Sequence, residues 1–395
     1  MVNEKMRELG ARRSVIRELF EYGKARKAEI GAENVFDFSL GNPSVPAPDE
    51  VGKALNDLID NRDPVALHGY TSAQGDAGVR ASIAEYLNHT YGAGVHADCL
   101  YLTVGAAASL TVSLTAILHP EDEVILLAPF FPEYRVFVER TGAKVVPVLC
   151  RAGDFQPDFE ALESAITEKT RAIIVNSPNN PTGAVLTEEN AEKLAALLKK
   201  SSEKYGAPIY LIADEPYREL VYGDVKVPYL TNYYDDTLVC YSFSKSLSLP
   251  GERIGYILVS PRAKEFTALY QAVCGAGRAL GFVCAPALFQ YLIPSVLGKT
   301  SDLTVYDSNR RLLYDALTEY GYEAVRPDGA FYLFVKALEP DANAFCERAK
   351  KFELLLVSAD SFGCEGYVRI SYCVSTEQIQ RSLPAFRKLA ESYGL

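Results

Sequence analysis

The hydrophobic and polar positions of this chain are arranged in blocks. From about residue 100, short runs that are apolar throughout are separated, in most cases, by amphipathic stretches such as TEENAEKLAALLKKSSEKYG at 187–206. Runs without polar alternation indicate strands buried on both faces, and the intervening helices indicate parallel connections. The predicted strands are EVILLAP (123–129), KVVPVLC (144–150), RAIIVNSP (171–178), IYLIADE (209–215), LVCYSFS (238–244) and GYILVS (255–260).

The last two of these runs follow each other too closely for a crossover helix. That pair is therefore antiparallel or separated in the sheet, and the predicted sheet is mixed. After about residue 300 the pattern changes to a helix at NRRLLYDALTEYG and strands at GAFYLFVK and VRISYC. We predict an α/β fold with a mixed, mostly parallel sheet sandwiched by helices in a large domain, residues 41–299. A smaller α+β domain comprises residues 1–40 and 300–395.

The first fifty residues contain two further segments. The first thirty residues are predicted to be helical, with Ile16, Leu19 and Phe20 as a short apolar stripe. FDFSLGNPSVPAPDEV, residues 36–51, is rich in proline and is predicted to be an extended loop.

Composition and charge narrow the classes of partner. The 395 residues are 48% hydrophobic and 23% charged, as in ordinary globular proteins, and the net charge of −11 argues against a nucleic-acid partner. Eight cysteines without a CxxC pair and four histidines without an HExxH motif predict buried free thiols and no metal site. The charged N-terminal segment is not a secretory signal, and no apolar run reaches eighteen residues, so a cytoplasmic protein is expected.

Polar or small residues follow several predicted strands at their carboxyl ends, where open α/β sheets bind ligands. They are Asp214, Asn180, Lys245 and the Gly105 turn. Each has an ordinary structural explanation. Asp214 could cap a helix, NNPTG is a common turn, the Gly105 turn could serve close packing, and Lys245 could be a solvated loop residue.

The combination of these residues points to a specific chemistry. Lysine amines are catalytic mainly through Schiff bases with a carbonyl compound, and the standard carbonyl partner is pyridoxal phosphate. Its ring nitrogen stays protonated beside an acid, which Asp214 could supply. Its phosphate needs helix N–H groups, a cation and hydroxyls, which the 105–107 turn, Arg253 and Ser242 could supply.

Motifs distributed along most of the chain strengthen this interpretation. From SLGNP at residue 39 to RISY at 372, the sequence resembles the fold-type I pyridoxal-phosphate enzymes, specifically the class I/II aminotransferases related to aspartate aminotransferase. Any one motif is weak, but all appear in the family's order. They are YTSAQGDAGVR, GAAASL, PFFPEY, NNPTG, DEPY, SFSK followed by PGERIGY, GAFY and VRIS.

The resemblance implies roles at the cofactor. Lys245 matches the Schiff-base lysine, which also moves the proton between the α-carbon of the substrate and the cofactor. Asp214 matches the partner of the pyridine nitrogen, and Asn180 and Tyr217 match the pair that hydrogen-bonds the ring hydroxyl. The other implied cofactor contacts are Phe131 on the ring face, Gly105, Ala106, Ala107, Ser242, Ser244 and Arg253 at the phosphate, and Tyr70 from the neighbouring subunit of a homodimer with shared active sites.

The resemblance also implies a substrate site. Arg369 matches the arginine that binds the α-carboxylate bidentately, with the Gly41 backbone and Asn180 nearby. Relatives specific for dicarboxylates carry a second arginine, for which Arg278 is the nearest candidate. Arg278 could instead be structural or face the dimer interface. The chain departs from the aspartate enzymes in having no tryptophan, so Phe131 takes the stacking position, and in its GAA phosphate turn.

These implications lead to a ping-pong aminotransferase that moves an amino group between an L-amino acid and a 2-oxo acid through a Lys245 Schiff base. A carbon–sulfur β-lyase of the same fold is the alternative, because reaction choice depends on small differences in substrate orientation. A non-catalytic module of a transcription regulator is a third hypothesis. It needs an attached DNA-binding domain, for which no room is expected before residue 40.

Overall fold

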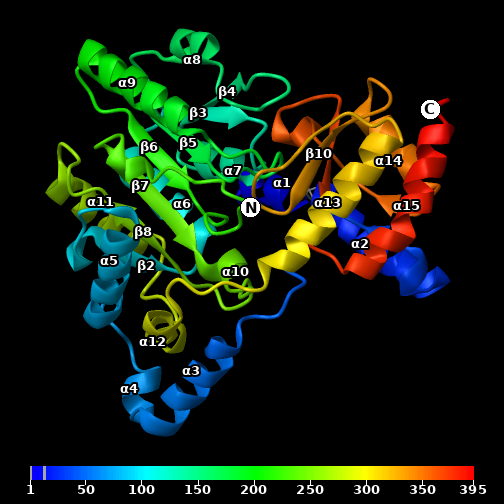
Figure 1. The fold of residues 1–395 in the computed structure, drawn as a ribbon. Helices are drawn as coiled ribbons and strands as arrows, with labels where there is room; N and C mark the ends of the chain where they lie inside the picture. Colours follow the sequence, from blue (N-terminus) through cyan, green and yellow to red (C-terminus); the bar gives the residue numbers. More distant parts are fainter. Residues whose placement is uncertain (1, 12–14) are drawn as a thin grey trace.

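A seven-stranded mixed sheet forms the centre of the larger part of the molecule (Figure 1). The computed structural model describes residues 2–11 and 15–395. The strand order is β2-β8-β7-β6-β5-β3-β4, and β8 runs antiparallel to both of its neighbours while the other pairs are parallel. The predicted mixed sheet is thus confirmed. The strands are β2 (Leu100–Thr103), β3 (Glu123–Ala128), β4 (Lys144–Leu149), β5 (Thr170–Asn176), β6 (Tyr210–Asp214), β7 (Thr237–Ser242) and β8 (Gly255–Val259).

Helices cover both faces of this sheet, which explains why its inner strands are mainly apolar, whereas the edge strand β4 buries only Val148. In β6, for example, Leu211 and Ala213 belong to the core on one face, whereas Tyr210 and Ile212 belong to the core on the other. The first face packs against α5 (Ala77–Tyr91), α8 (Phe159–Ala165), α9 (Glu188–Tyr205) and α12 (Ala287–Val296). The second packs against α6 (Ala106–Ile117), α7 (Glu133–Glu139) and α11 (Phe266–Ala279).

A smaller antiparallel sheet lies beside the large one and has its own core. Its order is β12-β13-β10-β9, and it packs with three helices that carry the C-terminal part of the chain. This arrangement fits the α+β pattern expected after residue 300. Its elements are β9 (Ala324–Val325), β10 (Tyr332–Lys336), β12 (Val357–Ser358), β13 (Tyr367–Ser371), α13 (Leu303–Glu319), α14 (Ala342–Lys350) and α15 (Thr376–Glu391).

The N-terminal segment joins this smaller part. Strand β1 (Phe36–Asp37) pairs in parallel with β11 (Leu354–Leu355), and helices α1 (Glu4–Ala11) and α2 (Val15–Ile30) precede it. The predicted apolar stripe is right for Leu19, which is buried, and for Ile16, which packs against the same core. It is wrong for Phe20, which is 37% exposed.

Residues 36–51 are only partly the extended loop that their prolines predicted. The two residues of β1 open this segment, and α3 (Asp49–Asn61) begins directly after Pro48. With α4 (Pro64–His68), α3 projects away from both sheets as an arm at the bottom of Figure 1. The position of the arm leaves the side chains of Ile59 and Val65 exposed.

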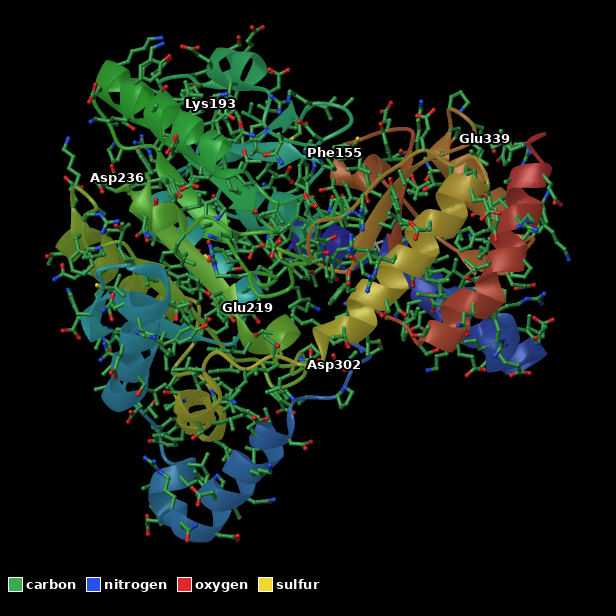
Figure 2. All side chains as sticks on the ribbon, viewed as in Figure 1. Phe155, Lys193, Glu219, Asp236, Asp302 and Glu339 are labelled. Carbon is green, nitrogen blue, oxygen red and sulfur yellow. The ribbon has the colours of Figure 1, made fainter. Side chains whose placement is uncertain are left out.

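Aromatic residues connect the large sheet to the small one. Phe155, labelled in Figure 2, lies in the loop after β4, with its ring centroid 5.2 Å from that of Phe334 and 5.8 Å from that of Tyr367. The carboxyl ends of the large-sheet strands are therefore close to β10 and β13.

The predictions on thiols and metal can be compared directly with the described residues. All eight cysteines are free, and five of them are buried. No cluster of three or more His, Cys, Asp or Glu side chains suited to a metal ion occurs within residues 2–11 and 15–395. Nor is any helix in those ranges long and apolar enough to cross a membrane.

Candidate active site

A cavity of about 310 Å³ lies at the carboxyl ends of β5, β6 and β7, next to the small sheet. A larger hollow of about 800 Å³ along α9 contains none of the predicted site residues. Residues far apart in the sequence therefore meet at the boundary between the large sheet and the small sheet. The predicted residues that line the cavity are Gly41, Ala106, Ala107, Phe131, Asn180, Asp214, Tyr217, Ser242, Ser244, Lys245, Arg253 and Arg369.

Lys245 lies on α10 (Phe243–Ser246), a single helical turn directly after β7. Ser242 caps this turn by accepting a hydrogen bond from the Ser244 N–H at 3.1 Å. The Lys245 Nζ donates to the Gly41 carbonyl at 2.7 Å, and the described residues give it no carboxylate partner. Burial lowers the pKa of Lys245 to about 8, and the positive charges of Arg253 and Arg369 act in the same direction. The amine is thus partly neutral near neutral pH.

Asp214 is the last residue of β6 and is buried. Its Oδ2 accepts a hydrogen bond from the hydroxyl of Tyr134 and a long one from Asn176 Nδ2 at 3.5 Å. Its Oδ1 is buried without any hydrogen-bond partner. Burial raises the pKa of Asp214 to about 7, against the lowering effect of the Tyr134 hydroxyl. An unpartnered buried carboxylate oxygen is costly unless a donor occupies the space beside it.

One end of the cavity is built to hold an anion. Helix α6 begins after Gly105, so the unpaired N–H groups of its first turn, at Ala106 and Ala107, open onto the cavity. Gly105 has φ 93°, and a Cβ there would lie 2.6 Å from Arg253 Nη2. Arg253 Nη1 also donates to Ser244 Oγ at 3.4 Å. Helix N–H groups, a guanidinium and hydroxyls are the donors that bind phosphate.

The opposite wall carries a buried guanidinium. Arg369, on β13, is 2% exposed. Its Nη1 donates to Asn180 Oδ1 at 3.1 Å and its Nη2 to the carbonyl of Ser39, whereas Nε has no partner. No carboxylate among the described residues pairs with Arg369. Because an unpaired buried cation is unfavourable, this arginine is suited to bind a carboxylate from outside the chain.

Three predicted residues do not line the cavity of this chain: Gly105, which directly precedes its Ala106–Ala107 edge, Tyr70 and Arg278. Tyr70, between α4 and α5, is 89% exposed. Arg278 lies in the last turn of α11 and is exposed, and neither residue lines the cavity. Their predicted roles, at a phosphate of the neighbouring subunit and at a distal carboxylate, stay predictions.

Three residues of the site were not singled out from the sequence. Tyr134 and Asn176 bind Asp214, and the hydroxyl of Tyr332 lies 2.8 Å from that of Tyr217. Tyr134 lies in the PFFPEY motif and Tyr332 in GAFY, so both were within quoted segments. The available signal was the choice of tyrosine over phenylalanine in apolar surroundings, because a buried hydroxyl needs a partner.

Pyridoxal phosphate fits this set of donors. The free Oδ1 of Asp214 suits a protonated ring nitrogen, the first turn of α6 with Arg253 suits the phosphate, and Lys245 suits the carbonyl carbon. The cavity volume also suits a small aromatic cofactor together with a small substrate.

Comparisons with known proteins identify the family. Residues 33–386 match the family described as Aminotransferase class I and II. An amino transferase structure from Eubacterium rectale is 58% identical, covers 100% of both chains and has a TM-score of 0.98. An aspartate aminotransferase of Thermotoga maritima is 30% identical over 91% of this chain and 92% of its own. An aromatic-amino-acid aminotransferase of Thermococcus litoralis is 28% identical over 97% of each chain.

The chain therefore belongs to the class I and II aminotransferases, as its motifs predicted. It is a pyridoxal-phosphate-dependent enzyme that transfers amino groups, and its α/β fold is that of the aspartate aminotransferases. Amino acids and 2-oxo acids are the substrates of this family. No observation favours the carbon–sulfur β-lyase alternative.

Proposed function

We propose that the protein is a cytoplasmic, homodimeric aminotransferase with a ping-pong reaction, in which Lys245 is the residue that carries pyridoxal phosphate covalently. The observation that supports this most strongly is the convergence of three groups on one cavity. They are a buried lysine whose pKa is lowered to about 8, a carboxylate oxygen without a partner on Asp214, and the unpaired guanidinium of Arg369.

The proposed mechanism assigns each residue a task. When bound, pyridoxal phosphate supplies a carbonyl for the amino group and a ring that withdraws electrons from the substrate α-carbon. Once the substrate amine has replaced it on the cofactor, the freed Lys245 Nζ would accept and return the α-proton. A pKa of about 8 leaves about one such amine in ten neutral at pH 7. Asp214 holds a proton on the ring nitrogen through Oδ1. Asn180 and Tyr217 donate hydrogen bonds to the ring oxygen.

The substrate end depends on Arg369. Its terminal nitrogens donate to Asn180 Oδ1 and to the Ser39 carbonyl, and its remaining N–H groups, Nε among them, are left for a carboxylate in the cavity that Lys245 and Gly41 also line. Arginine can hold both oxygens of a carboxylate at once, which sets the orientation of the α-carbon. Phe131, on the cavity wall, stacks on the cofactor ring in this proposal, and Ser242, Ser244 and Arg253 hold the phosphate.

The homodimer rests on exposed residues. Tyr70 on the loop after the α3–α4 arm is 89% exposed, and Val65 and Ile59 on the arm are 81% and 56% exposed. An exposed apolar arm is typical of an interface. In this proposal Tyr70 reaches the phosphate of the partner's site, and Arg278 reaches a distal carboxylate of an acidic substrate.

The division into domains 41–299 and 1–40 with 300–395 also stays a prediction.

The test is a half-reaction. The purified protein, loaded with pyridoxal phosphate, is mixed with single amino acids, and conversion of the bound cofactor is followed by absorbance. We expect a yellow protein that converts with an amino donor and returns with an oxo acid. Lys245→Ala should lower the rate by about a thousandfold or more. The matched control is Lys200→Ala, which removes an exposed lysine paired with Glu163 and should leave the rate unchanged.

A colourless protein that cannot be loaded with cofactor would contradict the proposal. Release of pyruvate and sulfide from cystathionine or cystine without an oxo acid would identify a β-lyase instead. Arg278→Ala separates substrate classes. A slower reaction with acidic donors but not with neutral ones supports the assigned role, and an unchanged ratio contradicts it.

A further inference from the structure

Tyr332, at the start of β10, occupies an unusual position among the proposed site residues. It is 2% exposed, lines the cavity, and contacts three of them. Its hydroxyl lies 2.8 Å from the hydroxyl of Tyr217, and its ring lies 4.7 Å from the guanidinium carbon of Arg369. A Cβ at residue 41 would lie 2.0 Å from its hydroxyl oxygen, so the Gly41 backbone packs directly against it. Tyr332 therefore bridges the cofactor side and the substrate side of the site.

The two hydroxyls share one hydrogen bond, and either can be the donor. Burial raises the pKa of Tyr332 to about 12 and that of Tyr217 well above its usual value, so both are neutral phenols near pH 7. Two phenols carry two hydrogens, but only one hydrogen fits between two oxygens 2.8 Å apart. The second hydrogen is available to the cavity, since neither hydroxyl has another partner in the part of the chain that the structure describes.

The identity of the outward donor depends on what the cavity holds. When Tyr332 donates to Tyr217, the Tyr217 hydrogen is free to bind the ring oxygen of the cofactor. When Tyr332 turns its hydrogen to an acceptor near Arg369 and Gly41, Tyr217 donates to Tyr332 instead. The acceptor expected at that position is the substrate carboxylate, which Arg369 attracts.

We propose that Tyr332 and Tyr217 form a hydrogen-bond switch that links the binding of a carboxylate at Arg369 to the hydrogen bond on the cofactor ring oxygen. Tyr332 is a positioning residue in this scheme, because it acts on the cofactor through Tyr217. The proposal rests on the proposed function. It adds a way for the substrate to change the electronic state of the cofactor before any bond is made.

The charged groups around the pair fix the direction of the effect. In the loaded enzyme Lys245 would carry the cofactor, so Arg369 and Arg253 are the cations of the cavity wall and Asp214 is its acid. Cys373 is the other titratable group close to Tyr332. A hydrogen bond from Tyr217 stabilises negative charge on the ring oxygen and so favours the deprotonated form of the bound cofactor. Withdrawal of that bond, on carboxylate binding, should raise the apparent pKa read from the cofactor absorbance. Cooperative donation by Tyr332 strengthens the bond when the carboxylate is absent.

The experiment uses the cofactor-loaded enzyme and Tyr332→Phe, with propionate as an unreactive carboxylate probe. Absorbance is titrated with pH without and with saturating propionate. In the wild type, propionate should raise the apparent pKa of the cofactor. In Tyr332→Phe, the apparent pKa of the cofactor without propionate should be higher than in the wild type. The rise that propionate causes should therefore be smaller than the wild-type rise, by about 0.5 pH units. KM for the amino donor should change less than kcat.

Tyr372→Phe is the matched control. Tyr372 is also a buried tyrosine, and its hydroxyl lies 3.3 Å from that of Tyr222 and 3.1 Å from the carbonyl oxygen of Ala330, but it does not line the cavity. Both titrations of Tyr372→Phe should match the wild type. If Tyr332→Phe gives the same titration curves as the wild type, the proposed switch is wrong. If Tyr372→Phe changes the apparent pKa as much as Tyr332→Phe does, the effect is an indirect result of lost packing, and the switch is again wrong. A wild-type protein that takes up no cofactor would instead contradict the proposed function.

Discussion

Asp214 and Glu219 are two acids five residues apart, Asp214 a buried residue and Glu219 a half-buried one whose Oε2 is buried. Each accepts a hydrogen bond from a tyrosine, Asp214 from Tyr134 and Glu219 from Tyr241 at 2.9 Å. Each has one buried oxygen without a hydrogen-bond partner, Oδ1 in Asp214 and Oε2 in Glu219. Burial raises the pKa of both groups to about 7. By charge and burial alone, either could be the acid of an active site.

The space beside each free oxygen separates the two. Asp214 lines the cavity of about 310 Å³ that Lys245 also lines. Glu219, labelled in Figure 2 near α10, borders a void of only about 10 Å³ on the other side of β7, among tyrosine rings. That void holds at most one water molecule. A raised pKa therefore identifies a functional acid only when a cavity with a reactive partner adjoins it.

The largest expected difference between the two acids is in activity. In the proposed function Asp214 holds a proton on the ring nitrogen. Asp214→Asn removes that negative charge, so kcat/KM should fall about a hundredfold to a thousandfold. Glu219→Gln keeps the shape of the side chain outside the cavity, so kcat/KM should stay within about threefold of the wild type. Half-reaction rates with one amino donor measure both variants. A comparable loss in Glu219→Gln would show that the acids are not functionally distinct.

The second difference is in the pH dependence of stability. A glutamate whose pKa is about 7 in the folded state, against about 4.3 when unfolded, binds more protons in the folded state between these values. Its contribution to the free energy of unfolding is therefore full below about pH 4 and is lost as pH rises toward 7. In the cofactor-loaded protein, Glu219→Gln should flatten this decline by about 2–3 kcal/mol.

Urea denaturation at several pH values, with cofactor in excess, measures this effect. Asp214 should not contribute a similar decline once a protonated ring nitrogen faces Oδ1, because a cation lowers the pKa of a neighbouring carboxyl group. Identical slopes for the wild type and Glu219→Gln would contradict the raised pKa of Glu219.

The smallest difference concerns the two tyrosine donors. The hydroxyl of Tyr134 stabilises the charged form of Asp214, so Tyr134→Phe should weaken cofactor binding about fivefold to tenfold. Tyr241→Phe removes the corresponding donor to Glu219 and should leave the cofactor dissociation constant unchanged. Equilibrium titration of the cofactor-free variants with pyridoxal phosphate decides between them. Equal losses would indicate that both tyrosines act through general packing.

Predictions from the sequence agree best with the structure where a residue type has one dominant structural role. Five of the six apolar runs are strands buried on both faces, which excludes polar residues, whereas β4 is an edge strand in which only Val148 is buried. Lys245 and Arg253 stand out because charged residues are rare at such positions. Strand β2 was missed because LYLT is only four residues long and adjoins the Gly105 turn. The α3–α4 arm was not predicted. Prolines lie where its helices begin, but the sequence does not indicate that these helices extend away from both sheets.

Tyr134, Tyr332 and Glu219 were missed for a different reason. The chain has 25 tyrosines and 18 phenylalanines, most of which serve packing, so a functional tyrosine does not differ in pattern from a structural one. Its role depends on which hydroxyl or carboxylate lies opposite, and that depends on contacts between β6, α7 and β10. Sequence separations of 80 and 115 residues carry no local signal of such pairs.

The origin of the two halves of the cavity has a consequence for how this enzyme can diverge. Asp214, Ser242 and Lys245 belong to the middle of the chain and to the large sheet. Arg369, Tyr332 and the Ser39–Gly41 segment come from near its two ends, which β1 and β11 bring together. Mutations of terminal residues other than Tyr332 and Gly41, which contact Tyr217 and Lys245, should therefore alter substrate binding more than cofactor binding. The substrate preference of such an enzyme can therefore change step by step while every intermediate variant still binds the cofactor.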